Sequence, residues 1–281
     1  SCGSWAPRSA MSMSSTATSV SVGRRSGLGP RGDLLRQIAG VLTFAVVLWL
    51  NSFAGAGGLS GESIGVIANR YSSDFLPADY VFGIWGLIYL GLFAFTVFQA
   101  LPRQRTNPLL RRLGWLWPAN GLLNIAWIVT FSFSRFGAAM IVMLILLSSL
   151  VATHVRVGIE DDLGWKERAF IAAPFAIYLA WVSVAFVANS FQYLTYLDLD
   201  VSLGNGPVWS AAMMLATTAL AAFMAWRRRV WLYPIVVAWA LSGIAVRFAE
   251  TGMLAGTAWA MVIIGLGSLA ISRRKRNRAW A

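Results

Sequence analysis

The sequence predicts an all-α integral membrane protein with eight transmembrane helices, and three observations support this prediction. Of its 281 residues, 58% are hydrophobic and only 12% are charged, whereas roughly 25% of the residues in an average soluble domain are charged. The apolar residues gather into eight segments, most of them close to the ~20 residues that a helix needs to cross a bilayer. The basic residues fall in alternate connections between these segments.

The eight predicted spans alternate with polar or basic connections. They cover residues 37–56, 81–100, 113–133, 138–155, 170–192, 208–226, 230–248 and 252–271. With both termini placed inside, every Lys and Arg except Arg70, Arg135 and Arg247 falls on the inner side, as the positive-inside rule requires. Topology therefore accounts for the net charge of +12, and we expect no nucleic-acid partner.

The two ends of the chain are basic. Residues 1–35 are rich in Ser, Gly and Arg, and we expect them to be disordered; residues 272–281 form a basic C-terminal tail. The N-terminal composition fits a cytoplasmic tail of a bacterial protein or an organellar transit segment. We therefore expect a bacterial inner membrane, with an organellar membrane as the alternative, and Met11 or Met13 lies nearer a natural start.

A candidate site begins at the long connection of residues 57–80, which leads into the second span. Pro77 and Asp79 suit the start of a helix. Trp85 and Tyr89 follow at an i, i+4 spacing, which places both rings on one helical face. This pair predicts the wall of a pocket beneath a polar loop. The alternative is that both rings serve packing or the interfacial aromatic belt.

The spans contain no acidic or basic side chain near a helix centre, which disfavours a carboxylate proton relay or ordinary ion coupling. Amides and aromatic residues remain. Asn124 lies three residues before Trp127, Tyr178 three before Trp181, and Asn189 eight after Trp181. Such residues suit a large, flat, apolar ligand held by stacking and a few hydrogen bonds; the alternative is that the amides bond across helices.

The sequence offers few metal ligands. Its one Cys is Cys2 and its one His is His154, so we expect no metal site made from protein side chains alone. His154 lies at the inner end of its span, where a helix C-terminus favours an interfacial residue. A role as the axial ligand of a haem-type or chlorophyll-type metal is the less favoured alternative.

Three motifs resemble those of the TspO/MBR family of tryptophan-rich sensory proteins, which are related to the mitochondrial translocator protein. The first is Pro-x-x-x-x-Phe-Gly-x-Trp-x-x-x-Tyr, and the second is Leu-Asn-x-x-Trp. The third is Tyr-x-x-Trp-Val-Ser-x-Ala with a later Asn. Their residues here are Pro77, Phe82, Gly83, Trp85 and Tyr89; Leu123, Asn124 and Trp127; and Tyr178, Trp181, Val182, Ser183, Ala185 and Asn189.

The resemblance implies a five-helix TspO-like membrane domain over residues 36–195, followed by a three-helix C-terminal extension over residues 196–271. It also implies a pocket beneath the loop between the first two helices that binds porphyrins and other tetrapyrroles, with steroid or drug-like ligands in some members. The lining carried over by motif comprises Pro77, Trp85, Tyr89, Asn124, Trp127, Tyr178, Trp181 and Asn189.

Two features depart from the family pattern. The family loop usually reads Trp-Thr-Pro-Pro, whereas the aligned residues here are Asp74, Phe75, Leu76 and Pro77. Phe75 is the only aromatic residue among these four, and we include it in the candidate site. Acidic residues rather than Lys or Arg follow Tyr193 and Tyr196, so the steroid-recognition pattern gains no support.

We expect a membrane receptor, sensor or trafficking protein that binds a tetrapyrrole or a similar hydrophobic ligand and requires no cofactor. The alternative is an accessory subunit of a larger membrane complex, with or without pigment. An enzymatic role is disfavoured because the spans supply no charged acid, base or metal centre. The expected partners are a hydrophobic small molecule and membrane lipid, with a second copy or another membrane protein as further candidates.

Overall fold

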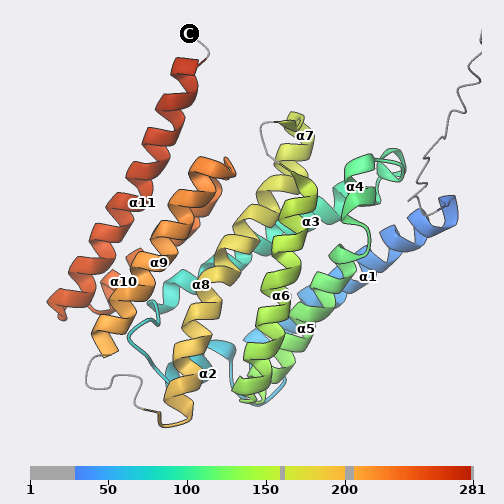
Figure 1. Cartoon of the computed structure of the whole chain (residues 1–281). Coiled ribbons are helices and arrows are strands. Elements are labelled where there is room, and N and C mark those ends of the chain that lie inside the picture. The colour runs from blue at the N-terminus through green and yellow to red at the C-terminus, as the bar shows by residue number, and fades with distance from the viewer. Residues whose placement is uncertain (1–28, 159–161, 200–205, 280–281) are drawn as a thin grey trace, which may run out of the picture.

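A computed structural model describes residues 29–158, 162–199 and 206–279, and all regular structure within these ranges is helical. Eight helices lie at the positions of the eight predicted spans (Figure 1). They are α1 (Pro30–Gly55), α3 (Ile84–Ala100), α5 (Leu116–Ser132), α6 (Phe136–Val157), α8 (Ala173–Tyr196), α9 (Gly206–Arg227), α10 (Leu232–Arg247) and α11 (Gly252–Ala279). The predicted all-α fold is confirmed for the described residues.

The connections hold shorter helical elements. They are α2 (Ile64–Arg70), η1 (Asp79–Gly83), η2 (Pro102–Gln104), α4 (Pro108–Leu113), α7 (Trp165–Glu167) and η4 (Arg168–Ala172). The Ser63 hydroxyl accepts a hydrogen bond from the Val66 N–H and caps α2, as N-cap serines do. The connection of residues 57–80 therefore contains a helix, which the apolar pattern did not predict.

Six segments are long and apolar enough to cross a membrane, and α10 is a shorter apolar helix. The six are Pro30–Gly55, Asp79–Ala100, Phe136–Val157, Trp165–Tyr196, Gly206–Arg227 and Gly252–Ser272. Large apolar side chains on their outer faces are exposed, with Trp49 at 63%, Leu90 at 65% and Ile263 at 70%. Exposure of this kind suits contact with lipid rather than water. The chain is a multi-pass integral membrane protein.

The helices form two groups, and α8 of the first group packs against α10 of the second. Helices α1, α5, α6 and α8 pack in series, and α3 contacts both α1 and α8. Helices α9, α10 and α11 contact one another, and α10 packs against α8 and joins the two groups (Figure 1). The C-terminal helices are thus attached to the first five mainly through the α8–α10 contact, with smaller contacts of α10 with η1 and of α9 with α8.

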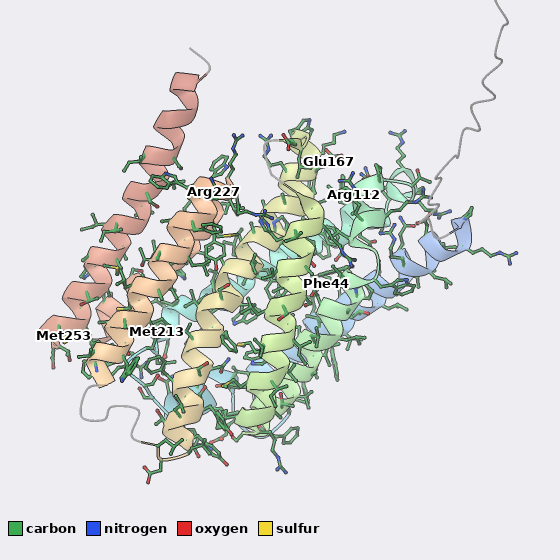
Figure 2. All side chains as sticks on the ribbon, in the orientation of Figure 1. Phe44, Arg112, Glu167, Met213, Arg227 and Met253 are labelled. Atoms are coloured by element: carbon green, nitrogen blue, oxygen red, sulfur yellow. The ribbon has the colours of Figure 1, made fainter. Side chains whose placement is uncertain are left out.

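Two basic residues of the predicted inner-side connections, Arg112 and Arg227, lie toward one end of the bundle. Figure 2 shows Arg112, Glu167 and Arg227 toward the same end, with Met213 and Met253 toward the other. Helix α2 lies at the end opposite α4 and α7 (Figure 1). The end of α1 nearest Pro30 and the C-terminal end of α11 also lie toward the α4 and α7 end (Figure 1).

The start of the first helix differs from the prediction. Residues 30–35, assigned to a disordered tail, belong to α1; residues 1–28 of that tail lie outside the described residues. Asp33 is fully buried and accepts a hydrogen bond of 3.0 Å from Arg111 Nε, and Arg36 lies 3.9 Å from the same carboxylate. This ion cluster holds the first turns of α1 against α4, a contact between residues 78 positions apart that local composition does not report.

Candidate ligand pocket

Trp85 lies at the centre of an aromatic cluster drawn from three helices. Its ring stacks on Tyr89 at 5.4 Å and on Trp127 of α5 at 5.9 Å between centroids. The rings of Tyr178 and Trp181 on α8 meet Trp85 edge-on, each at 6.2 Å. These offset and edge-to-face arrangements are the favourable ones for aromatic pairs. The i, i+4 spacing of Trp85 and Tyr89 thus does place both rings on one face.

A polar chain of three hydrogen bonds runs behind these rings. The Tyr89 hydroxyl donates to Asn51 Oδ1 at 2.6 Å. Asn51 Nδ2 donates to Asn124 Oδ1 at 3.0 Å, and Asn124 Nδ2 donates to the Tyr178 hydroxyl at 2.9 Å. The chain connects α3, α1, α5 and α8 in turn, so it fixes the relative positions of four helices around Trp85.

Two cavities adjoin the aromatic cluster, and Trp85 lines both of them. One, of about 280 Å³, is lined by residues of α1, α2, α3 and α5. The other, of about 50 Å³, is lined by residues of α2, α3, α5, α8 and the loop before η1. Four side chains line both cavities and separate them: Ile64, Phe82, Trp85 and Trp127. Small-molecule pockets usually have volumes of ~300–1,000 Å³, and each of these cavities is smaller than that. A ligand too large for either cavity therefore needs these four side chains to move.

The smaller cavity has hydrogen-bond donors that bind nothing within the described structure. The indole Nε1 atoms of Trp127 and Trp181 are buried without a partner, and both rings line this cavity. A buried donor left unsatisfied costs roughly 1–3 kcal/mol. Two indole rings with unsatisfied donors therefore belong to the wall of one cavity.

A family comparison matches most of the chain. The family model described as TSPO-like protein matches residues 37–271. The chain belongs to this TSPO-like family. Searches of curated proteins and of solved structures returned no significant match. Family membership indicates a ligand-binding or sensing role in a membrane in general terms. The matched region includes α9, α10 and most of α11 as well as the five helices that the TspO/MBR motifs cover.

The predicted site residues of this family member take different places around the two cavities. Pro77, Trp85, Trp127, Trp181 and Asn189 line the smaller cavity, and Trp85, Tyr89 and Trp127 line the larger one.

Three further predicted residues lie behind the cavity walls. Asn124 and Tyr178 are buried and belong to the polar chain. Phe75 is fully buried and stacks on Phe191 of α8 at 5.6 Å. These three side chains therefore support the wall and do not line either cavity.

Sequence reasoning missed several residues of the site. Asn51 lies in the polar chain and lines the larger cavity, and Gln192 lines the smaller one while its amide donates to the Ile67 and Ala68 carbonyls at 3.4 Å. Both amides lie in helices with long apolar runs, where an uncharged polar side chain is itself a signal. Nothing in the local sequence indicates Ile64 of α2, since that helix was not predicted.

Helix α10 fixes the loop that leads into the site. The Ala78 N–H donates to the Gly243 carbonyl at 3.1 Å, and Trp239 Nε1 donates to the Val81 carbonyl at 3.1 Å. Arg247 lies 3.8 Å from the Asp79 carboxylate and donates to the Ser72 hydroxyl at 3.0 Å. The C-terminal helices therefore hold the segment that carries Pro77 and Phe82, two of the cavity-lining residues.

His154 lies apart from the aromatic cluster. It is 9% exposed on α6 and lines a different cavity, between α6, α8, α9 and α10. It lies in the last turn of α6, at the helix end that the sequence predicted, and is buried beside Arg228 of the α9–α10 connection. Within the described residues, no three His, Cys, Asp or Glu side chains lie close enough to hold a metal ion.

Proposed function

We propose that this protein is a membrane receptor or sensor that binds a tetrapyrrole, or a flat apolar ligand of similar size, between α1, α2, α3, α5 and α8. The single observation that carries the proposal is the aromatic box of Trp85, Trp127 and Trp181, which flanks two cavities and presents two unpartnered indole donors. Stacking surfaces with a few convergent donors suit a large conjugated ring that bears acceptor groups.

Binding of so large a ring requires the partition between the cavities to open. Trp85 and Phe82 are only partly buried, and their side chains, with Trp127 and Ile64, are what separates the cavities of about 280 and 50 Å³. In this proposal, movement of these side chains joins the two spaces. In this proposal the protein binds and senses the ring and does not transform it, and it holds no obligatory cofactor.

The test is titration of the purified full-length protein with protoporphyrin IX, in which quenching of Trp fluorescence reports binding. Saturable micromolar binding is expected, and Trp85→Ala or Trp181→Ala weakens it by about tenfold or more, since stacking and ring burial are worth ~1.5 kcal/mol at each position. Trp49→Ala is the matched control because Trp49 is 63% exposed on the outer face of α1. Affinity unchanged in Trp85→Ala and Trp181→Ala excludes this pocket.

The same preparation tests the alternative role. A protein that binds no porphyrin and copurifies from its native membrane with other chains in mild detergent is an accessory subunit. We propose a bacterial inner membrane as its location; fractionation of the source cells distinguishes this from an organellar membrane.

A further inference from the structure

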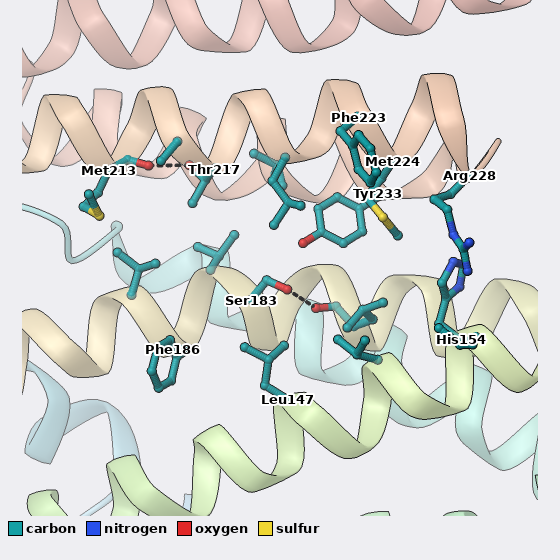
Figure 3. A pocket seen from close by; sticks show the side chains of 18 residues that line it. Leu147, His154, Ser183, Phe186, Met213, Thr217, Phe223, Met224, Arg228 and Tyr233 are labelled. Carbon is teal, nitrogen blue, oxygen red and sulfur yellow. Dashed lines mark hydrogen bonds between the residues drawn. The ribbon is translucent and has the colours of Figure 1, made fainter.

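A second cavity, of about 550 Å³, lies between α6, α8, α9 and α10 (Figure 3). Its wall is almost entirely apolar, and its volume lies within the ~300–1,000 Å³ of small-molecule pockets. None of Trp85, Trp127 and Trp181 lines it, although Val184 of α8 contributes to both this cavity and the smaller aromatic one. It is therefore a separate site on the other face of α8.

The cavity opens sideways toward the membrane. Val151 and Val155 of α6 line one edge and are 47% and 58% exposed; Leu220 and Phe223 of α9 line the other and are 42% and 52% exposed. In a chain that spans a bilayer, such exposed apolar positions meet acyl chains. A membrane lipid can thus enter between α6 and α9 without passing through water.

The polar groups of the cavity are unsatisfied at one end only. The Ser183 and Thr217 hydroxyls donate to the Leu179 and Met213 carbonyls of their own helices, at 2.8 and 2.9 Å. The Nε2 atom of buried His154 has no hydrogen-bond partner. Of the buried polar atoms without a partner in the described structure, the one on a residue that lines this cavity is His154 Nε2.

Arg228 joins His154 at that end. Figure 3 shows the two side chains pointing toward each other, and Arg228 is half-buried. Among the described residues no carboxylate lies within ion-pair distance of Arg228. A guanidinium fork beside an imidazole suits a phosphate, which accepts two parallel hydrogen bonds from Arg and a third from a neighbouring donor.

The cavity is nearly as long as one leaflet is thick on its α6 side and longer than a leaflet on its α9 side. Its lining extends from Leu147 to Val155 on α6 and from Met213 to Arg228 on the other side, or ~12 and ~22 Å along the helix axes at 1.5 Å per residue. Half of the hydrocarbon core is ~15 Å. His154 and Arg228 lie at the end of the bundle where Arg227 and Arg112 also lie, which is the headgroup level of the basic side.

We propose that this cavity binds an acyl chain of an anionic phospholipid from the basic-side leaflet, with the lipid phosphate between His154 and Arg228. The lateral opening leaves the second chain in the bilayer. A guanidinium next to His154 favours an anion there and disfavours a metal bound to the imidazole, so this site differs from the axial-ligand role considered for His154.

The test uses delipidated full-length protein in detergent, titrated with phosphatidylglycerol or phosphatidylcholine and followed by native mass spectrometry. Phosphatidylglycerol is expected to bind about fivefold more tightly or better, which is the effect of one basic group at a membrane surface. Arg228→Gln removes most of that preference. Ala216→Trp fills the apolar part of the cavity and abolishes binding of both lipids, because Ala216 lines it.

Two matched controls separate the site from general charge and bulk. Arg112→Gln removes an exposed Arg at the same end of the bundle, and Ala219→Trp adds the same ring to an exposed position of α9 that does not line the cavity. Neither is expected to change lipid binding. If Arg228→Gln fails to fold, Ala216→Trp against Ala219→Trp still decides the question.

Four results overturn the proposal. Equal affinity for the two phospholipids, or unchanged binding in both Arg228→Gln and Ala216→Trp, excludes an anionic lipid at this cavity. Oleate that displaces phosphatidylglycerol at lower concentration reassigns the site to a fatty acid. A Soret band of the purified protein that disappears in His154→Ala reassigns it to a tetrapyrrole. Trp85→Ala leaves the lipid result unchanged, so this test and the porphyrin titration fail independently.

Discussion

Helix α10 approaches the loop of the aromatic site closely at Gly243, and adding a single methyl group there tests this contact. A Cβ at this position would lie 2.1 Å from Val81 Cγ2 and 3.1 Å from Pro77 Cβ. Carbon atoms pack best at ~3.5–4.0 Å. Gly243→Ala therefore requires a displacement of more than ~1 Å, and Val81 is fully buried and stiff at χ1.

The cost follows from this geometry. Overpacking of a well-packed contact costs ~1–3 kcal/mol. Separation of α10 from the loop also lengthens the bonds from Ala78 N–H to Gly243 O and from Trp239 Nε1 to Val81 O, both 3.1 Å; such bonds contribute ~0.6 kcal/mol each in membranes. The gain in helix propensity from Gly to Ala, ~1 kcal/mol, acts in the opposite direction.

Gly267→Ala is the matched control because it carries the same propensity gain in α11 with no atom within 4 Å of the added Cβ. The difference between the two variants isolates the packing cost, which we expect to be ~1–3 kcal/mol. Thermal unfolding in detergent measures it, at one fixed scan rate because such unfolding is often irreversible. A Tm lower by ~2–8 °C in Gly243→Ala than in Gly267→Ala is expected.

Two further measurements link this contact to the site. Gly243→Ala is expected to change the affinity for protoporphyrin IX, because Pro77 lines the smaller cavity. Adding Val81→Ala to the Gly243→Ala protein is expected to recover part of the lost stability. The double-mutant cycle then shows a favourable coupling of ~0.5–3 kcal/mol. Equal Tm values for Gly243→Ala and Gly267→Ala, with additive effects of Val81→Ala, would refute the close approach and the role assigned to α10.

Three more predictions concern polar contacts. Asn124→Leu is expected to lower the unfolding free energy by ~1–3 kcal/mol, since it strands the buried Tyr178 hydroxyl; Tyr178→Phe should then add less than it does alone, and additivity in thermal unfolding counts against the polar chain. Asp33→Asn is expected to cost ~1–3 kcal/mol because Asp33 is fully buried against Arg111, with Tm as the readout and an unchanged Tm as the contrary result. Arg247→Gln is expected to increase proteolytic cleavage within residues 71–79, which it holds through Ser72 and Asp79; identical cleavage rates would show that these contacts do not hold the loop.

The sequence by itself determined the membrane class, the positions of the eight long helices and the aromatic pairs of single helices. These properties depend on local patterns. A bilayer demands a continuous apolar run, and the helical repeat places Trp85 and Tyr89 on one face wherever that helix packs. The TspO/MBR motifs lie on the second, third and fifth spans and indicated the family. The family match over residues 37–271 supports this assignment to the family.

Tertiary structure alone decided which faces meet. Asn51 joins Tyr89 to Asn124 across 38 and 73 positions of chain, and α10 holds a loop more than 150 residues before it. Phe75 and Tyr178 became buried supports because neighbouring helices cover them. Periodicity reports the face of one helix and carries no information on its partner. Distant segments must pack together before a cavity wall or a buried ion pair exists. The same holds for the pairing of His154 with Arg228 at one end of the second cavity.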